Sequence, residues 1–498
     1  MKRIFSVLCV LALLIGTCAF SAQAAEQTEC ACADIPFIRL HGIGETLYLN
    51  EGTPDEKEVG VANTEALQDA IIPLALSIVK AAAARSWSEG AKAIEILATA
   101  LFGRLQVDTD GKSVQPITRT ASVNPDQNHK ENPIYDFDYD WRLDPMDSAK
   151  KLAAHIKEVQ RVTGHKKVIL CPQSEGGLIV TAYLAQEGSD AIDHIIPVMA
   201  AHGGLSMVGE LATKKIDISG RAAARYLRSY LGEEGDMGIV SSLIGVLDEA
   251  KLLDAVTEAV GILIQNTGEQ LYRDVFVPLL FQWPALWGFI PNEYYDEAKA
   301  KLLDDPKYDN FKKIIDEYHN KAGAIAGDLY RQAAQNGVKV SVIAGWNFSG
   351  MPFSGKADTM TDGLIDTSLE SFGAICAPYG EVFSADYIQK IADGYNHISP
   401  DFCLDASACL FPESTWFIKN QIHFSFDSSS DFVRFLRYSQ KQPTVRTNSQ
   451  FPQFMTRLSD GTFVPATAEQ TIAKEYTLFS AAWELIERIA NAAVVNFF

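Results

Sequence analysis

Ser174 is the side chain of this sequence best placed to act as a nucleophile. It lies in residues 172–177 (PQSEGG), between a short apolar run and a stretch whose apolar residues recur at helical spacing. A serine on a sharp strand-to-helix turn is the layout of a nucleophile elbow, in which the residue two places further on must be small. Gly176 meets this need, although Pro172 stands where the usual motif has a glycine. The alternative is a solvated turn that contains a serine.

A serine hydroxyl needs a base, normally histidine, and a carboxylate that holds the imidazole in one tautomer. Around a nucleophile elbow these groups follow one another along the chain as serine, acid and histidine. This order leaves two of the nine histidines, His397 and His423. We favour His423, because it directly follows the apolar run 416–422 (WFIKNQI) and precedes an amphipathic segment. His397 lies in NHISP, which is typical of a hydrogen-bonded turn, and remains the alternative.

Three aspartates precede these histidines in one polar loop. They are Asp358, Asp362 and Asp366. We favour Asp362 over Asp366 as the acid, because glycine and an apolar pair follow Asp362 and let its carboxylate turn toward the histidine. The alternative for both is an ordinary surface charge.

A glycine-bearing loop, residues 41–45 (HGIGE), directly follows the predicted strand 36–40 (PFIRL). Hydrolases with a nucleophile elbow place backbone N–H groups for a developing oxyanion in such a loop. The alternative is a simple tight turn.

The elements that must position these groups alternate between strand and helix. Apolar runs bounded by polar residues predict strands at 36–40, 134–141, 168–171, 195–199, 338–344 and 416–422. Amphipathic helices are expected at 148–163, from 178 and from about 431. The strand-helix-strand rhythm predicts an α/β fold with a mostly parallel central sheet flanked by helices.

Two insertions interrupt this rhythm. The first, at about 45–133, shows helical periodicity over 61–104, and the second, at about 205–334, is helical without clear strands. We expect the second to be a cap over the carboxyl ends of the strands, where open α/β sheets bind ligands. Its aromatic residues Trp283, Trp287 and Phe289 are candidates for a substrate pocket, and the alternative is that they form the core of the cap.

The amino terminus predicts export. Lys2 and Arg3 precede an apolar run, and the small residues at 21–25 (SAQAA) form a cleavage site, so residues 1–25 are expected to be a signal peptide. A retained anchor helix is the alternative. We expect a secreted or cell-surface protein with one domain over 26–498, a long helix over 468–498 and no integral membrane segment after cleavage. The formal net charge of −20 argues against nucleic acid and anionic membranes as electrostatic partners.

Six cysteines remain after the signal peptide, at positions 30, 32, 171, 376, 403 and 409. Cysteines in an exported protein are permitted to form disulfides, and we expect Cys403 and Cys409 to pair because they are close in a loop-like stretch. No Cys-x2-Cys or His-x3-His spacing supports zinc. The predicted chemistry requires no metal or organic cofactor.

Taken together, several short segments of the sequence resemble the α/β-hydrolases of the lecithin:cholesterol acyltransferase-like branch, which includes lysosomal phospholipases. The resemblance is carried by residues 41–44 (HGIG), 139–143 (YDWRL), the Ser174 elbow, Ile290-Pro291 and 362–365 (DGLI). It implies an α/β-hydrolase fold and a triad of Ser174, Asp362 and His423. It also implies that the N–H groups of Ile43 and Glu175 form the oxyanion hole.

The expected function is therefore that of a serine esterase or lipase that acts on acyl esters, including lipids, through an acyl-enzyme. Two alternatives remain open. An acyltransferase would move the acyl group to an alcohol in place of water, and a catalytically silent surface-binding scaffold would have kept only the fold. The sequence does not predict an oligomeric state.

Overall fold

The computed structural model describes most of residues 30–468. Its described ranges are residue 30, residues 32–60, 86–231 and 251–468, with single residues and short runs between 69 and 80 and between 242 and 248. The predicted signal peptide, the helical periodicity from 61 to 85 in large part and the predicted tail helix beyond 468 lie outside the described residues.

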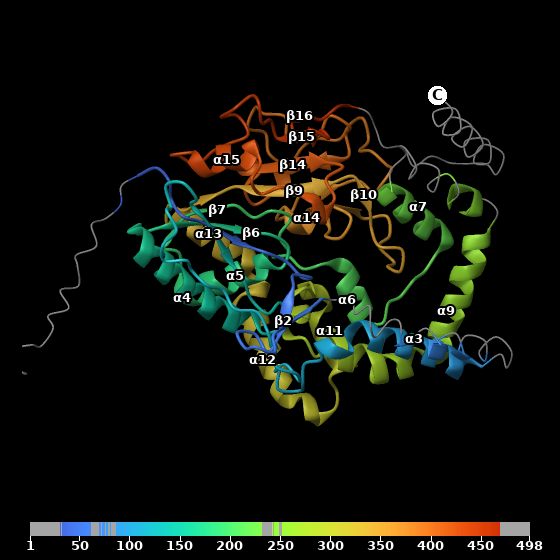
Figure 1. The fold of residues 1–498 in the computed structure, drawn as a ribbon. Coiled ribbons are helices and arrows are strands. Elements are labelled where there is room, and N and C mark those ends of the chain that lie inside the picture. Colours follow the sequence, from blue (N-terminus) through green and yellow to red (C-terminus); the bar gives the residue numbers. More distant parts are fainter. Residues whose placement is uncertain are drawn as a thin grey trace, which may run out of the picture.

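A parallel sheet forms the centre of the molecule (Figure 1). Five strands have the order β5-β1-β6-β7-β8 and four have the order β16-β15-β14-β9. The strands are β1 (Phe37–Leu40), β5 (Ile134–Phe137), β6 (Val168–Pro172), β7 (Ile192–Ile195), β8 (Lys339–Val340), β9 (Val342–Trp346), β14 (Thr415–Lys419), β15 (Phe454–Arg457) and β16 (Phe463–Pro465). Among these nine strands, as far as the structure describes the chain, β15 and β16 form the one antiparallel pair. The five-stranded and four-stranded groups are continuous with each other. Ser341 alone separates β8 from β9, and Val198, which follows β7, forms a parallel β-bridge with Ile343 of β9.

Alternating side chains on the strands build one core on each face of the sheet. Ile38 and Leu170 belong to the core that contains α4 (Pro145–Thr163), α5 (Gly176–Glu187) and α13 (Ala326–Gln335). Their sequence neighbours Phe37, Ile169 and Cys171 point to the other core, with Phe432 and Leu436 of α15 (Asp431–Tyr438). The predicted α/β fold with helices on both faces is thus confirmed (Figure 1).

Most predicted elements lie where the sequence placed them, with shifted ends. The strand expected at 134–141 ends at Phe137, and the strand expected at 195–199 is β7, which ends at Ile195. Residues beyond β7 still contact the sheet, because Val198 bridges both Gln173 and Ile343. Helix α4 begins three residues earlier than expected, because the Asp144 side chain accepts a hydrogen bond from the Met146 N–H as its N-cap.

The first insertion is not purely helical. It contains α3 (Trp87–Phe102) and the 3-10 turn η1 (Gly103–Leu105), but also an antiparallel sheet of three strands. These are β2 (Leu47–Leu49), β3 (Lys57–Val59) and β4 (Ile117–Thr118). The sequence analysis did not predict these strands, because a run of two or three residues is too short to show an alternating pattern.

The second insertion is helical in its described part, as predicted. Its elements are α6 (Ser206–Ala212), α7 (Gly220–Leu231), α9 (Leu252–Leu271), the π-helical η2 (Tyr272–Phe281), α10 (Pro284–Gly288), α11 (Asn292–Leu302), η3 (Pro306–Tyr308), α12 (Asp309–Lys321) and η4 (Gly323–Ile325). Leu271, Val275 and Leu279 pack on Ala91 of α3, so the two insertions share a small core. In Figure 1 helices α6, α7 and α9 lie toward the end of the sheet at which β9 and β14 finish.

The segment between β9 and β15 contributes short elements around the site. They are β10 (Phe348–Ser349), β11 (Met360–Thr361), α14 (Thr367–Glu370), β12 (Ile375–Cys376), β13 (Leu404–Asp405), η5 (Ala406–Ala408), η6 (Pro412–Ser414) and η7 (His423–Ser425). The expected pair Cys403–Cys409 is wrong for this structure, because both thiols are free. Cys403 Sγ instead donates to Asp401 Oδ1 at 3.0 Å, and the loop is held by this contact.

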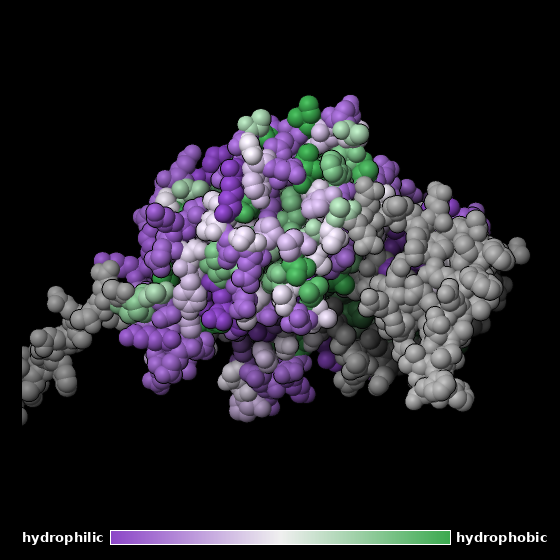
Figure 2. Space-filling view, turned by 90° about the horizontal axis from the view of Figure 1, so that it is seen from above, coloured by the Kyte–Doolittle hydropathy of each residue, from purple (hydrophilic) through white to green (hydrophobic). Residues whose placement is uncertain are grey.

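Over the part of the face in Figure 2 that the structure describes, hydrophilic residues predominate and hydrophobic residues form small groups among them. Within the described ranges, no helix has both the length and the hydropathy that a membrane crossing requires.

Candidate active site

Ser174 lies on a turn that close packing forces into a left-handed conformation. Its φ is 49°, in a region that non-glycine residues rarely adopt. The turn joins β6 to α5, and Gly176 lets the helix pass the neighbouring strand: a Cβ there would lie 2.9 Å from the Leu40 carbonyl oxygen. Gly42 is equally confined, because a Cβ on it would lie 2.6 Å from Ser174 Cβ and 2.9 Å from Ser174 Oγ. The serine is therefore fixed between two glycines.

Pro172, the departure from the usual elbow motif, is accommodated as the last residue of β6. Its carbonyl accepts from the Val198 N–H at 2.9 Å, and the Gln173 N–H supplies the next bond, to the Leu40 carbonyl at 2.9 Å. The elbow thus forms without a glycine at this position.

His423 contacts Ser174 from the loop that follows β14. Its Nε2 lies 2.9 Å from Ser174 Oγ, and its backbone N–H donates to the Asp362 carbonyl at 3.0 Å. The turn η7 begins at His423, so the ring projects from the end of a strand whose five residues are all buried. The residue is 7% exposed.

Asp362 completes a continuous chain of three side chains. Its Oδ2 lies 2.6 Å from His423 Nδ1, while its Oδ1 accepts from the N–H groups of Leu364 at 2.9 Å and Ile365 at 2.7 Å. The carboxylate is fully buried, and these bonds fix its orientation. An Nδ1–H held by a carboxylate leaves Nε2 as the acceptor that faces the serine.

The other two aspartates of the same loop have different partners. Asp366 precedes α14 and accepts from the Ser206 N–H at 2.8 Å, and Asp358 forms an ion pair with Arg225 of α7. Tyr226 of α7 also donates to the Gly363 carbonyl at 2.9 Å. Hence Asp362 is the aspartate of this loop that contacts His423, and Asp366 and Asp358 attach the loop to the second insertion.

Glu370 is a buried carboxyl beside Asp362 that the sequence analysis did not identify. Burial raises its pKa well above the ordinary value, and the charge of Asp362 raises it further. Its Oε1 accepts from the Gly345 N–H at 2.8 Å. Both effects favour the neutral form of Glu370, in which it adds no second negative charge next to Asp362.

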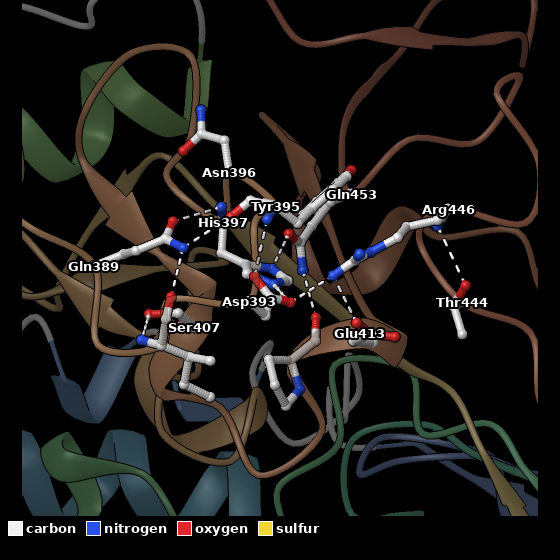
Figure 3. A network of polar contacts seen from close by, with 12 residues as sticks. Gln389, Asp393, Tyr395, Asn396, His397, Ser407, Glu413, Thr444, Arg446 and Gln453 are labelled. Carbon is white, nitrogen blue, oxygen red and sulfur yellow. Dashed lines mark hydrogen bonds and ion pairs between the residues drawn. The ribbon is translucent and has the colours of Figure 1, made fainter.

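His397 lies in a separate network (Figure 3). Its Nδ1 is 2.8 Å from Gln453 Oε1 and its Nε2 is 3.2 Å from Asp393 Oδ2. Asp393 also forms an ion pair with Arg446, which pairs in turn with Glu413 at 2.6 Å. Both ring nitrogens of His397 are therefore occupied by groups other than Ser174.

The loop that carries Ile43 is held in place by the 139–143 segment. Tyr139 Oη donates to the His41 carbonyl at 2.5 Å and Trp141 Nε1 donates to the Glu45 carbonyl at 2.9 Å. Below them Arg142 and Asp140 form a buried bidentate pair, with Nε–Oδ1 at 2.9 Å and Nη2–Oδ2 at 2.6 Å. The bonds from Tyr139 and Trp141 thus fix the carbonyls of His41 and Glu45, at the two ends of the loop.

The two N–H groups expected to form the oxyanion hole belong to Ile43 and Glu175. Both residues are described, and neither N–H donates a hydrogen bond within the described part of the chain. The position that a Cβ on Gly42 would occupy lies 2.9 Å from Ser174 Oγ and 3.7 Å from the Glu175 N. The Glu175 N–H therefore lies close to the serine hydroxyl. The Glu175 side chain points into the protein, where burial raises its pKa well above the ordinary value and nearby Asp140 raises it further.

The three aromatic residues suggested for a substrate pocket are buried in the main core. Trp283 Nε1 donates to the Leu105 carbonyl and Trp287 Nε1 to the Phe281 carbonyl, both at 2.9 Å. Trp287 also lines a cavity of about 380 Å³, whose lining does not include Ser174 or His423. These contacts favour the alternative that the aromatics, with Phe289, form the core of the cap, and a contact with substrate stays a prediction.

Comparisons with known proteins give little further guidance. No protein-family model matches the chain. No curated protein matches it. Among solved structures, it is similar to the crystal structure of the Tle4-Tli4 complex, at 12% sequence identity and a TM-score of 0.25, with 62% of this chain and 75% of that chain covered.

Proposed function

We propose that this protein is a serine hydrolase that cleaves acyl esters through an acyl-enzyme. The observation that carries the proposal is the unbroken chain of contacts from Asp362 through His423 to Ser174, at 2.6 Å and 2.9 Å. A nucleophile in contact with a base, which is oriented by a third group, is the arrangement that activates a serine hydroxyl.

The steps follow from the atoms in contact. His423 Nε2 takes the proton of Ser174 Oγ as the oxygen attacks the ester carbonyl, and the imidazolium is stabilised by Asp362. The imidazolium then gives the proton to the leaving alcohol, and the acyl-enzyme remains. Water, deprotonated by the same nitrogen, releases the acid and restores the serine. No step requires a metal or an organic cofactor.

The backbone N–H groups of Ile43 and Glu175 would stabilise the tetrahedral oxyanion. Neither N–H has an acceptor within the described ranges, and the Tyr139 and Trp141 bonds tie the carbonyls of His41 and Glu45 on either side of Ile43. Donors that need no rearrangement are the effective ones, and losing one such donor typically costs about 10²- to 10³-fold in turnover.

The substrate class is proposed from two exposed apolar residues that are next in sequence to residues in contact with Ser174. Ile43, which follows Gly42, is 38% exposed, and Phe424, which follows His423, is 69% exposed. Exposed apolar side chains in the loops of the site favour an acyl chain over a charged substrate. Together with the resemblance to the lecithin:cholesterol acyltransferase-like branch, this supports an esterase or lipase, phospholipase-like in its substrates, that acts outside the cell after cleavage of the predicted signal peptide.

Hydrolysis of a series of acyl esters, from short p-nitrophenyl esters to phosphatidylcholine vesicles, tests the proposal. We expect free acid to be released without any added alcohol, and Ser174→Ala to lower turnover by on the order of 10⁴ to 10⁶. Ser439→Ala is the matched control, since its hydroxyl donates to the Phe435 carbonyl at the end of α15, and it should retain activity.

Three results would contradict parts of this proposal. Product that forms only when an alcohol acceptor is present would identify an acyltransferase. Activity that survives in Ser174→Ala, or wild-type protein inactive toward every ester, would remove the proposed role of the serine.

A further inference from the structure

Two cysteines and two histidines converge at the end of the sheet opposite to Ser174. One ligand atom from each of Cys30, Cys32, His129 and His165 lies within 4.8 Å of all the others. The Cys30 Sγ is 3.3 Å from the Cys32 Sγ and 3.4 Å from the His129 Nε2. The Cys32 Sγ is 3.6 Å from the His129 Nε2 and 3.3 Å from the His165 Nε2. The same ring nitrogen of both histidines thus faces the two sulfurs.

The four residues come from three segments that precede three neighbouring strands. The cysteines precede β1, His129 precedes β5 and His165 precedes β6, and these strands are adjacent in the order β5-β1-β6. Because the strands are parallel, their amino ends meet at one edge of the sheet, while Ser174 follows the carboxyl end of β6. In Figure 1 this edge is where the chain enters β1, away from α6, α7 and α9.

The spacing of the four atoms suits a tetrahedral ion. Zinc binds thiolate at about 2.3 Å and imidazole at about 2.0–2.1 Å, so the ligand atoms of a tetrahedral site lie roughly 3.3–3.8 Å apart. The four distances given above run from 3.3 to 3.6 Å. A tetrahedral set of two sulfurs and two nitrogens is characteristic of zinc.

We propose that Cys30, Cys32, His129 and His165 bind one Zn²⁺ as a structural site. Four protein ligands close a tetrahedral shell and leave no position for substrate, which separates structural from catalytic zinc. Binding converts two thiols to thiolates with release of two protons, and the thiolates neutralise the ion. The ion would fasten the segment before β1 to the loop before β5 and to the turn between α4 and β6.

The surrounding backbone already holds the ligands close to these positions. The Cys30 N–H donates to the carbonyl of Gly164, the glycine that ends α4 with a φ of 73°. His165 comes next in the chain and is buried, with its N–H 3.3 Å from Thr163 Oγ1. A site that is largely formed before the ion arrives loses little chain freedom on binding.

A disulfide between Cys30 and Cys32 accounts for fewer of these contacts than a zinc site does. Their sulfurs are 3.3 Å apart, against about 2.05 Å for a disulfide bond. A disulfide would also leave unexplained why the Nε2 atoms of two histidines, from segments about 100 and 133 residues away in sequence, face the sulfurs. Pairing remains an outcome that the experiment must distinguish.

Metal analysis of the purified full chain tests the proposal. We expect about one zinc per chain in the wild type, and loss of bound zinc in the Cys30→Ser/Cys32→Ser variant and in His129→Asn. Cys376→Ser is the matched control, because this free cysteine lies outside the cluster, and it should keep its zinc. Substitution of the wild type with Co²⁺ should give the visible absorption of a tetrahedral thiolate-bound ion, which requires no variant to fold.

Two results would overturn the proposal. Wild-type protein that holds no zinc and no added Co²⁺ would do so, as would peptide mass spectrometry that finds Cys30 joined to Cys32 in the active protein.

Removal of zinc by a chelator should lower the melting temperature of the wild type and of Ser174→Ala equally. That outcome is independent of the proposed hydrolase chemistry, so the two proposals can fail separately.

Discussion

Two buried histidines of this protein, His423 and His397, have similar surroundings, but of the two only His423 has a serine hydroxyl among its described contacts. His423 and His397 both follow the acid loop in the chain, and both contact an aspartate, Asp362 at 2.6 Å and Asp393 at 3.2 Å. They differ in the second ring nitrogen, which meets Ser174 Oγ in His423 and Gln453 Oε1 in His397. Burial and a carboxylate partner are therefore not enough to select a candidate general base, and the proposed role of His423 depends on the hydroxyl that faces its other ring nitrogen.

The largest effect should separate the two histidines in catalysis. His423→Gln removes the proposed proton acceptor and should lower kcat for ester hydrolysis by on the order of 10⁴ to 10⁶. His397→Gln should leave kcat within about threefold, since no contact links His397 to the serine. Steady-state kinetics on one acyl ester check both, and comparable losses in the two variants would break the comparison.

The acid partner should give a slightly smaller effect. Asp362→Asn keeps the shape but favours the wrong tautomer of His423, and should lower kcat by roughly 10⁴-fold. Asp366→Asn is its matched control, because Asp366 accepts from the Ser206 N–H and not from His423. Equal kinetic losses in the two variants would mean that the contact between Asp362 and His423 is not used.

For stability the order of the two regions should be reversed, with the larger effect at His397 and the smaller one at Ser174. His397→Ala leaves the buried Gln453 Oε1 without its hydrogen-bond partner and removes one of the partners of Asp393, and it should lower the free energy of unfolding by about 1–3 kcal/mol. Ser174→Ala removes one hydroxyl from a strained turn and should change stability by less than about 1 kcal/mol. Denaturant unfolding measures both changes. A larger loss in Ser174→Ala would indicate that the elbow, and not the His397 network, holds this part of the fold.

The smallest effect concerns the buried carboxyl next to the serine. The pKa of Glu175 is raised in the folded state, so between the ordinary carboxyl pKa and this raised value the folded state binds one more proton than the unfolded state. Wild-type stability must then fall as pH rises, by at most about 1.4 kcal/mol per pH unit from this group. Glu175→Gln has no such proton to lose.

Unfolding free energies at about pH 5 and about pH 7 therefore test the burial of Glu175. The advantage of Glu175→Gln over the wild type should grow with pH. A constant difference would mean that Glu175 is ionised in the folded protein.

The sequence could predict the candidate site residues that directly follow a recognisable strand, because their order along the chain is fixed in this type of fold. Ser174 was marked by its place between a strand and a helix, and His423 by the strand directly before it. The sequence favours Asp362 over Asp366 within one loop, and the observed contacts place Asp362 against His423 and Asp366 against the Ser206 N–H. The YDWRL string carries part of the family resemblance, yet its bonds to the carbonyls of His41 and Glu45 join residues nearly 100 positions apart and cannot be derived from local pattern.

What the sequence could not predict depends on contacts between distant segments. Glu370 is an ordinary glutamate until folding buries it beside Asp362. The expected Cys403–Cys409 pair was inferred from proximity along the chain, which does not fix the direction of either thiol. The four proposed zinc ligands have no motif spacing, because the sheet order and not the chain order brings Cys30, His129 and His165 together.

The central claim is that Ser174 is a nucleophile activated by His423. Reaction with a fluorophosphonate probe, followed by peptide mass spectrometry, tests it most directly, because the probe records which serine is activated without any assumption about the substrate. We expect the adduct on Ser174 in the wild type and in His397→Ala, and almost none in His423→Ala. An adduct on another serine, an adduct that forms equally fast without His423, or no adduct in the wild type would contradict the claim.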